Sequence, residues 1–555
     1  MSTAWWKNAV VYQIYPKSFC DTTGNGTGDL QGIIQKLDYL KNLGVDVLWL
    51  TPIYQSPQRD NGYDISDYYQ IHEEYGTMAD FEELLSEAHK RGLKIMMDIV
   101  INHTSTEHEW FKQARSSKNN PYRDFYIWRD GKNGEPPTNW ESKFGGSAWE
   151  YDDTTDQYYL HLFDVTQADL NWENEKVREA LYEMMHFWLR KGVDGFRLDV
   201  INLISKNQQF PQDDSDGRKF YTDGPRIHEF LQEMNEKVFS KYDLITVGEM
   251  SSTSIDHCIK YTKPESKELN MTFSFHHLKV DYPNGEKWTK APFDLQELKK
   301  ILSTWQIEMN KGGGWNALFW CNHDQPRVVS RFGDDQNYHR QSAKMLATVI
   351  HMMQGTPYIY QGEEFGMTNP AFKSIEQYRD VESLNIFEIM RKEGKCEKEI
   401  LEILQQKSRD NSRTPVQWNS EANAGFTTGT PWINTAANYR EINAKNALSD
   451  PDSIFYHYKK LIQLRKDYAI ISAGDFTPLL EDDDEVFVFV RTSGDEELLV
   501  INNFYGRKKE LLLPGQINLE GYHSEMLISN YKDSKPLTNK FSLRPYESIV
   551  YHLIK

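Results

Sequence analysis

Short runs of β-forming residues alternate with longer amphipathic segments along most of this 555-residue chain. The helical spacing of Ile33, Leu37 and Leu40 predicts a helix over 30–43, and the apolar run 93–100 predicts a strand covered on both faces. Eight strands are predicted in this way, over residues 10–15, 45–50, 93–100, 192–200, 244–248, 271–275, 317–321 and 357–361. Parallel strands with intervening helices in this number predict a closed (β/α)8 TIM barrel, an α/β fold whose functional residues follow the carboxyl ends of the strands.

Two stretches depart from this alternation. Residues 104–172 lack a regular period, are rich in aromatic and turn residues, and are too long for an ordinary loop, so they predict a subdomain inserted after the third strand. Residues 476–555 return to β-alternation and predict a C-terminal antiparallel β-domain, a β-sandwich. The barrel should therefore comprise residues 1–103 and 173–475.

The charge balance narrows the class of partner. The chain carries 63 Lys and Arg against 82 Asp and Glu, a formal charge of −19, which disfavours nucleic acid and anionic membranes and favours a small-molecule substrate. Its four cysteines are scattered without metal-ligand or redox spacing, and the first residues lack the pattern of a secretion signal. We expect a cytoplasmic protein and, by default, a monomer.

Carboxylates follow three of the predicted strands, at Asp199, Glu249 and Asp324. In the strand 192–200, side chains alternate between faces, so Arg197 and Asp199 share one face. This pair is either a structural ion pair or a carboxylate held ionised by a guanidinium. A retaining glycosidase needs two carboxyl groups about 5 Å apart, one as nucleophile and one as acid and base. Asp199 suits the nucleophile, and Glu249, in an apolar setting, suits the acid/base.

Short motifs in the order of the strands resemble the α-amylase superfamily of glycoside hydrolases, family 13. They are DIVINH at 98–103, QADLNW at 167–172, GFRLDV at 195–200, VGEM at 247–250 and WCNHDQ at 320–325, with Ala168 where proline is usual. The resemblance implies Asp199 as nucleophile, Glu249 as acid/base and Asp324 as stabiliser of the transition state. It also implies that His103, Arg197 and His323 line the subsite for the transferred glucose, and that the chemistry requires no cofactor.

Two further segments, DNGYD at 60–64 and RTPVQW at 413–418, resemble the exo-acting oligo-1,6-glucosidase branch of this superfamily. In that branch Tyr63 would stack on the terminal glucose, while Asp60 and Arg413 would hold its hydroxyl groups. Val200, directly after the expected nucleophile, also resembles this branch. The implied activity is that of a retaining α-glucosidase that releases single glucose units.

Three segments, WWKNAVVYQIYPKSF at 5–19, SRDNSRTPVQW at 408–418 and NFYGRKKELLLP at 503–514, are similar to the trehalose-6-phosphate hydrolases of this branch. The resemblance implies hydrolysis of α,α-trehalose 6-phosphate to glucose and glucose 6-phosphate. We expect His276, Lys279 and Lys287, after the sixth strand, to read the phosphate; alternatively, the lysines are ordinary surface cations. Competing functions are an oligo-1,6-glucosidase or dextran glucosidase acting on neutral substrates, a transglycosylase or isomerase, and a non-catalytic binding subunit. A binding subunit would be expected to lose part of the carboxylate trio or to carry a membrane anchor, and neither change is seen in the sequence.

The loop 21–29 places oxygen-bearing side chains on alternate residues, an arrangement that a hard cation favours. Asp21, Asn25, Thr27 and Asp29 are therefore candidate ligands for a structural Ca²⁺. A loop held by side-chain hydrogen bonds to its own backbone, without metal, is the alternative.

Overall fold

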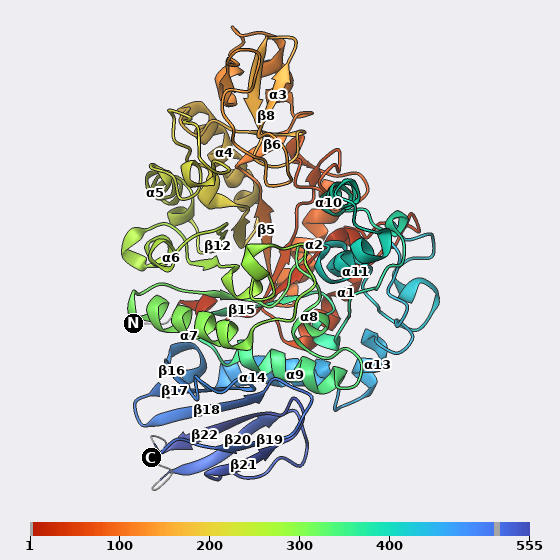
Figure 1. Cartoon of the computed structure of the whole chain (residues 1–555), viewed down its shortest axis with the longest axis vertical. Coiled ribbons are helices and arrows are strands. Elements are labelled where there is room, and N and C mark those ends of the chain that lie inside the picture. The colour runs from red at the N-terminus through yellow and green to blue at the C-terminus, as the bar shows by residue number, and fades with distance from the viewer. Residues whose placement is uncertain (1–3, 516–521) are drawn as a thin grey trace. The chain divides into compact units, whose positions relative to one another are not determined.

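A computed structural model of the chain describes residues 4–515 and 522–555 (Figure 1). Residues 1–3 and 516–521, which belong to the predicted barrel and C-terminal domain, lie outside the described residues. The chain divides into two compact units, one formed by 1–48 with 275–555 and the other by 49–274. No helix of the described part combines the length and the apolar character needed to cross a membrane.

The eight predicted barrel strands are present. They form one sheet in the order β13-β12-β11-β5-β2-β1-β15-β14, and the registered neighbours are parallel. Their bounds are β1 Val11–Ile14, β2 Val47–Leu50, β5 Lys94–Ile99, β11 Gly195–Leu198, β12 Ile245–Glu249, β13 Met271–Phe273, β14 Ala317–Leu318 and β15 Thr356–Tyr360. The strand residues are almost all buried, as expected for a sheet covered on both faces, and the predicted (β/α)8 fold is confirmed.

The strand that was predicted over 192–200 is shorter at both ends. Gly192 ends the preceding helix in the left-handed conformation, with φ of 107°. Val200 also leaves the strand, with φ of 36°, so it does not share the face of Phe196 and Leu198 as strict alternation would require. A β-branched residue in this conformation is strained, which marks the turn after Asp199 as a position that the surrounding structure must hold.

Local sequence sets the ends of the helices. Helix α1, which matches the predicted range 30–43, begins after Asp29, whose side chain accepts from the Gly32 N–H, and ends at Gly44. The helices of the first unit are α1 Leu30–Leu43, α7 Leu295–Lys311, α8 Val328–Phe332, α9 His339–His351, α10 Val381–Lys392, α11 Glu397–Lys407, α12 Asp410–Arg413, α13 Ala444–Ser449, α14 Ile454–Asp467 and α15 Ile470–Ala473. Those of the second unit are α2 Met78–Lys90, α3 Glu109–Ser116, α4 Glu175–Lys191, α5 Ile227–Lys237 and α6 Ile255–Thr262.

The second unit also contains the stretch that the sequence assigned to an inserted subdomain. It contains the antiparallel pair β6 His103–Ser105 and β10 Gln167–Asp169, and the sheet of β7 Trp128–Arg129, β9 Gln157–Leu160 and β8 Trp149–Asp152. A hairpin of β3 Tyr54–Gln55 and β4 Asp67–Ile71 precedes it. The aromatic core of the inserted stretch, with Trp140 and Trp149, packs against Val200 and Leu203. The insertion therefore supports the turn that follows Asp199.

A pair of helices that the sequence analysis did not identify, α10 and α11, follows β15. Phe387 and Met390 of α10 pack against Ile400 and Leu404 of α11 in a separate hydrophobic cluster. Asp380, buried at the amino end of α10, accepts hydrogen bonds from the first N–H groups of that helix. This helix pair thus presents a buried carboxylate beside the segment 408–413.

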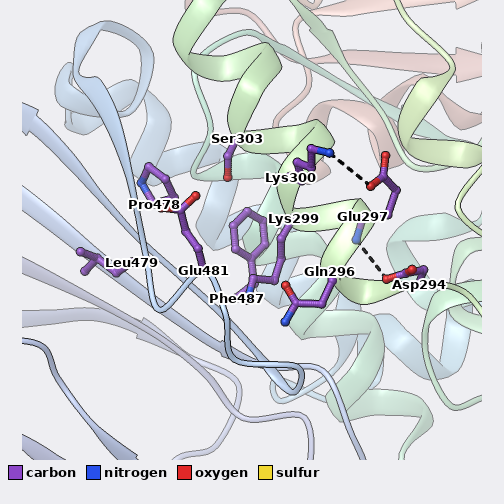
Figure 2. Close-up of a pocket in the computed structure, with 10 residues that line it drawn as sticks. All are labelled: Asp294, Gln296, Glu297, Lys299, Lys300, Ser303, Pro478, Leu479, Glu481 and Phe487. Carbon is purple, nitrogen blue, oxygen red and sulfur yellow. Dashed lines mark hydrogen bonds and ion pairs between the residues drawn. The ribbon is translucent and has the colours of Figure 1, made fainter.

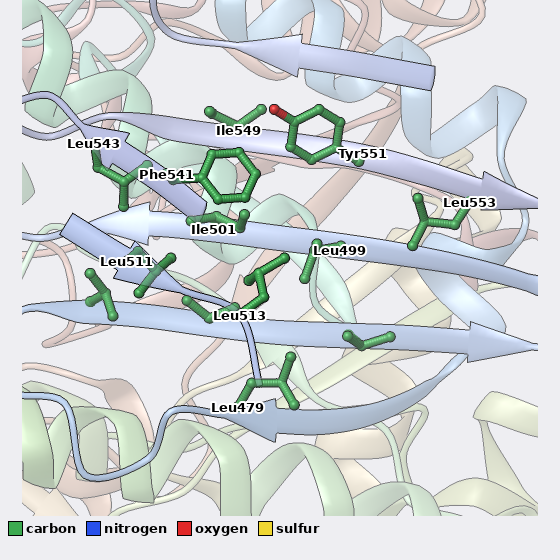
Figure 3. Packing of buried hydrophobic residues seen from close by; sticks show 13 residues of the cluster. Leu479, Leu499, Ile501, Leu511, Leu513, Phe541, Leu543, Ile549, Tyr551 and Leu553 are labelled. Atoms are coloured by element: carbon green, nitrogen blue, oxygen red, sulfur yellow. The ribbon is translucent and has the colours of Figure 1, made fainter. Parts of the chain in front are cut away.

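The C-terminal strands form the predicted antiparallel domain. They are β16 Asp475–Leu479, β17 Val486–Ser493, β18 Glu496–Asn503, β19 Lys509–Leu512, β20 His523–Ser529, β21 Lys540–Leu543 and β22 Ser548–Ile554. One sheet has the order β16-β17-β18-β22-β20, and β19 pairs with β21. Leu499, Ile501 and Tyr551 lie in the core between them (Figure 3). The five-stranded sheet contacts α7, α9 and α14 of the same unit (Figure 1).

Candidate active site

Three carboxyl groups surround the Arg197 guanidinium. Nη1 donates to Asp98 Oδ1 at 2.8 Å and to Asp199 Oδ1 at 2.6 Å, while Nη2 donates to Glu249 Oε2. All four side chains are buried. Because a single positive charge can offset only one of three carboxylates, the group is expected to hold at least one proton at neutral pH.

The ionisation of this cluster reflects burial and the shared guanidinium. Burial raises the pKa of Asp199 to about 7 and that of Asp98 to about 6, in both cases against the lowering effect of Arg197. A hydrogen bond from Glu249 lowers the pKa of Asp199. The expectation that Arg197 alone keeps Asp199 ionised is therefore incomplete, since burial of Asp199 opposes the effect of the guanidinium.

Asp98 connects this cluster to further predicted residues. The Tyr63 hydroxyl donates to Asp98 Oδ2 at 3.0 Å, and His103 Nε2 lies 3.1 Å from the backbone oxygen of Tyr63. Gln167 Nε2 donates to Asp60 Oδ2 at 3.1 Å and to the same Tyr63 oxygen at 3.2 Å. Burial lowers the pKa of His103 to about 4, so its imidazole is neutral near pH 7. The second unit thus links the six predicted site residues Asp60, Tyr63, His103, Arg197, Asp199 and Glu249.

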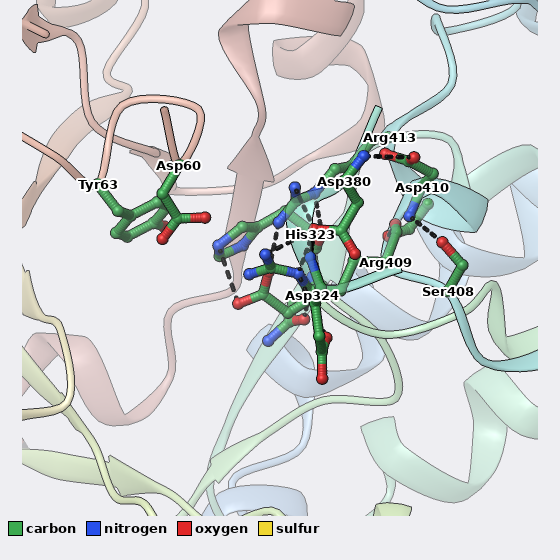
Figure 4. A network of polar contacts seen from close by, with 12 residues as sticks. Asp60, Tyr63, His323, Asp324, Asp380, Ser408, Arg409, Asp410 and Arg413 are labelled. Carbon is green, nitrogen blue, oxygen red and sulfur yellow. Dashed lines mark hydrogen bonds and ion pairs between the residues drawn. The ribbon is translucent and has the colours of Figure 1, made fainter. Parts of the chain in front are cut away.

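The first unit holds a second polar network, around Asp324 (Figure 4). Arg413 Nη2 donates to Asp324 Oδ1 at 2.6 Å, and Arg413 Nε donates to the backbone oxygen of His323 at 2.8 Å. Arg409 Nη1 lies 3.4 Å from the same Asp324 oxygen. Arg409 also binds Asp380 Oδ1 through Nε at 2.9 Å and Nη2 at 2.6 Å. Asp324, His323 and Arg413, three of the predicted site residues, are therefore brought together in the first unit.

Five polar residues of these networks were assigned no role from the sequence. Asp98 and Gln167 lie inside the motifs at 98–103 and 167–172, and Arg409 lies four residues before Arg413, so motif position could have suggested them. Gln13, whose Nε2 is 2.8 Å from His323 Nδ1, carries no motif signal. Asp380 likewise lies in no motif that could have suggested it. Burial would raise its pKa, but Arg409 and Arg413 hold the pKa of Asp380 at about 2.

The residues expected to bind a phosphate follow β13. His276 is half-buried, with its ring centroid 5.2 Å from that of Trp305, and the Lys279 side chain is exposed. Lys287 Nζ forms an ion pair with Glu382 at 2.7 Å. Part of the Lys287 charge is thereby offset, so a phosphate would have to compete with Glu382 for it. The phosphate role of these three residues stays a prediction.

The loop 21–29 was a candidate Ca²⁺ site, and its oxygens have other partners. Asp21 accepts from the N–H groups of Thr23, Gly24 and Gly26, at 2.8 to 2.9 Å. Asn25 Oδ1 accepts from the Thr27 N–H at 2.8 Å, and Asp29 accepts from the N–H groups of Thr22 and Gly32, each at 2.7 Å. This pattern fits a loop held by its own backbone donors better than it fits a Ca²⁺ ligand set.

A cavity of about 260 Å³ lies between α7 and the C-terminal β-domain (Figure 2). Glu297, Lys299, Ser303 and Phe487 are among its lining residues, and none of the predicted site residues lines it. Lys299 Nζ donates to the backbone oxygens of Leu480 at 3.0 Å and Asp483 at 2.5 Å. This lysine therefore joins α7 to the β-domain, which is a structural role.

Comparisons with known proteins agree with this arrangement. Residues 13–474 match the model of the alpha amylase catalytic domain, and 486–550 match that of the alpha-amylase SusG C-terminal domain. The chain is 68% identical to a trehalose-6-phosphate hydrolase of Bacillus subtilis over 555 residues, covering 100% of this chain and 99% of that protein. It is 56% identical to an oligo-1,6-glucosidase of Parageobacillus thermoglucosidasius, with both chains fully covered.

A solved structure shows the same similarity in three dimensions. The crystal structure of Bacillus licheniformis trehalose-6-phosphate hydrolase superposes with a TM-score of 0.97 and 71% identity over the whole of both chains. The catalytic-domain match covers most of the sequence, and the motifs at the strand ends are those of that domain. The chain belongs to the α-amylase family of glycoside hydrolases.

Proposed function

We propose that this enzyme is a retaining α-glucosidase that hydrolyses α,α-trehalose 6-phosphate to glucose and glucose 6-phosphate. In this proposal Asp199 attacks the anomeric carbon and forms a covalent glucosyl-enzyme. Glu249 first protonates the departing oxygen and then, as a base, activates the water that releases glucose. Asp324, held by Arg413 and Arg409, stabilises the positive charge that develops on the sugar.

The Arg197 guanidinium, which donates to both Asp199 Oδ1 and Glu249 Oε2, supports the retaining mechanism because it holds the two carboxyl groups close together. Retaining glycosidases hold their two carboxyl groups about 5 Å apart, whereas inverting enzymes separate them by about 6.5 to 9.5 Å to admit a water molecule. Two carboxyl groups bound to the same guanidinium fit the shorter separation. Proton NMR of the newly released glucose tests this directly: the α-anomer should form before mutarotation, and initial formation of β-glucose would refute retention.

The substrate assignment is supported by the 68% identity to a trehalose-6-phosphate hydrolase along the entire chain. The 56% identity to an oligo-1,6-glucosidase and the Lys287–Glu382 ion pair favour the second candidate, a glucosidase for neutral isomalto-oligosaccharides. Comparing kcat/KM for trehalose 6-phosphate, trehalose and isomaltose separates the two. We expect the phosphorylated substrate to be preferred; an equal or greater kcat/KM for isomaltose would establish the second candidate instead.

Lysine variants test which residues bind the phosphate. A charged hydrogen bond contributes about 1.5 to 3 kcal/mol, so K279A or K287A should lower the preference for trehalose 6-phosphate over trehalose by about 10-fold to 100-fold. Lys290 is the matched control, because it lies on the same segment and is paired with Glu402 at 3.0 Å. K290A should leave the preference unchanged. If K279A and K287A also leave it unchanged, the phosphate is bound elsewhere.

We also propose that the enzyme acts in the cytoplasm, as a monomer, with no cofactor in the chemical step. The four cysteines are free thiols, three of them buried, which fits a reducing compartment. Full activity after exhaustive dialysis against a chelator would support the absence of a metal requirement, and light scattering would test the oligomeric state.

A further inference from the structure

Asp199 and Glu249 lie where the backbone pairing between their strands stops. The ladder between β11 and β12 ends at the pair of Leu198 with Gly248. Beyond it, Val200 turns away in the left-handed conformation, and Ser252 also has a positive φ, of 56°. Beyond that pair, the ladder between β11 and β12 does not continue in the described residues, so this ladder alone does not fix the separation of Asp199 and Glu249.

One buried side chain bridges these loops. Asn202, in the short 3-10 helix Ile201–Leu203 that follows Val200, is 0% exposed. Its Nδ2 donates to the backbone oxygen of Ser251 at 3.0 Å, and its Oδ1 accepts from the backbone N–H of Ser251 at 2.9 Å. The amide thus reproduces, with a side chain, the pair of hydrogen bonds that an additional rung of the sheet would provide.

The Asn202 amide is itself held in place. Its Nδ2 lies 3.1 Å from Asp223 Oδ1, and the Asp223 N–H donates to the Asn202 backbone oxygen at 2.9 Å. The hydroxyl of Tyr261, on α6, donates to the same Asp223 oxygen at 2.5 Å, and His257 Nδ1 lies 3.2 Å from the other oxygen. Asn202 is three residues after Asp199, and Ser251 is two residues after Glu249, so little chain separates this bridge from either carboxylate.

We propose that Asn202 is a positioning residue that fixes the separation of the nucleophile Asp199 and the acid/base Glu249 through its two hydrogen bonds to Ser251. The backbone N–H of Val200, which lies 3.3 Å from Glu249 Oε2, depends on the same turn for its direction. A displacement of about 1 Å between catalytic groups can cost about 100-fold in rate. The inference rests on the proposed roles of Asp199 and Glu249.

The variants N202A and N202D test this role. N202A removes the bridge, whereas N202D keeps the size of the side chain and the acceptor for Ser251 N–H but loses the donor to Ser251 O. With p-nitrophenyl α-glucoside as substrate, we expect kcat to fall about 10-fold to 100-fold in both variants, with KM changed by less than about twofold. Loss of folding by N202A would leave N202D as the test.

A pH profile separates positioning from simple destabilisation. Among the groups that face Asp199 in the second unit are Arg197, Asp98 and Glu249; Arg197 donates to all three carboxyl groups and lowers the pKa of Asp199. If the bridge keeps Asp199 and Glu249 on this guanidinium, N202A should move the acidic limb of kcat/KM to higher pH. N202D adds a carboxylate that would move the limb by itself, so the pH comparison uses N202A. A purely structural role would lower Tm and leave the limb in place.

Asn530 provides a matched control in the C-terminal domain. It is also a buried amide that bridges backbone, accepting from the Ser548 N–H at 2.9 Å and donating to the oxygens of Tyr546 at 2.6 Å and Gln341 at 3.0 Å. N530A should lower Tm and leave kcat and the pH profile unchanged.

The inference is wrong if folded N202A and N202D keep wild-type kcat and pH profile, or if N530A loses kcat to the same extent. D199N distinguishes failure of the proposed function from failure of the positioning role. If D199N stays active, the proposed roles of Asp199 and Glu249 are wrong. If D199N is inactive while N202A and N202D behave as wild type, only the positioning role of Asn202 is wrong.

Discussion

Replacing Asp98 by Asn should make Asp199, the proposed nucleophile, easier to ionise. Asp98 Oδ1 and Asp199 Oδ1 accept from the same Arg197 nitrogen at 2.8 and 2.6 Å, so the two oxygens are about 5 Å apart or closer. Two unit charges about 5 Å apart interact by about 3 kcal/mol at an effective dielectric constant of about 20, and by half of that at about 40. Since one pH unit corresponds to about 1.4 kcal/mol, D98N should lower the pKa of Asp199 by about one to two units.

The assay is the pH dependence of kcat/KM for p-nitrophenyl α-glucoside between pH 4 and 9. The acidic limb, which would report ionisation of the proposed nucleophile Asp199 in the free enzyme, should move to lower pH in D98N. Asp152→Asn is the matched control, because Asp152 is a buried carboxylate of the same unit, paired with Arg115 at 2.6 Å. An active D98N enzyme whose acidic limb stays in place or moves to higher pH would refute the assignment of that limb to the Arg197 cluster.

Three further predictions concern stability and metal dependence. Burial raises the pKa of Glu363 to about 7, above its unfolded value of about 4.3, so its contribution to stability is present below pH 4 and is lost as pH rises through 7. E363Q should therefore gain Tm relative to wild type as pH rises from 5 to 8 in calorimetry; a difference that is constant with pH would contradict this. Leu499 is fully buried in the C-terminal core, so L499A should lower the free energy of unfolding in urea by about 2 to 5 kcal/mol without changing kcat at 25 °C. Because Asp21 and Asp29 already accept backbone N–H donors, EDTA should leave Tm unchanged within about 1 °C, whereas a fall that added Ca²⁺ reverses would restore the metal interpretation.

Local sequence patterns were sufficient for the fold. Apolar runs and helical spacing identified every barrel strand and the helix 30–43, because burial on both faces of a parallel strand leaves a continuous apolar signal. The alternation of apolar and polar residues along 476–555 identified the C-terminal β-domain. The helices α10 and α11 were not identified; they lie in a stretch rich in charge, and their buried residues pack in one cluster with Phe372, Tyr378 and Ile433.

The site was predictable where residues stand in short motifs at strand ends. Arg197, Asp199 and Glu249 were found in this way, and the structure links them through one guanidinium. Asp380 and Asn202 were not assigned a role, because their partners Arg409 and Ser251 are 29 and 49 residues away in the chain. Hydrogen bonds between such distant residues leave no periodic pattern for sequence analysis to detect.

The sequence by itself determined the barrel, the C-terminal domain and the identity of the motif residues, because these depend on local periodicity and on residue type at strand ends. Only the tertiary structure decided the electrostatics of the site. It placed three carboxyl groups on one guanidinium, paired Lys287 with Glu382 and turned the oxygens of the loop 21–29 toward backbone donors. Protonation and charge depend on burial and on which groups lie within a few ångströms, and these are properties of packing that a linear pattern does not contain.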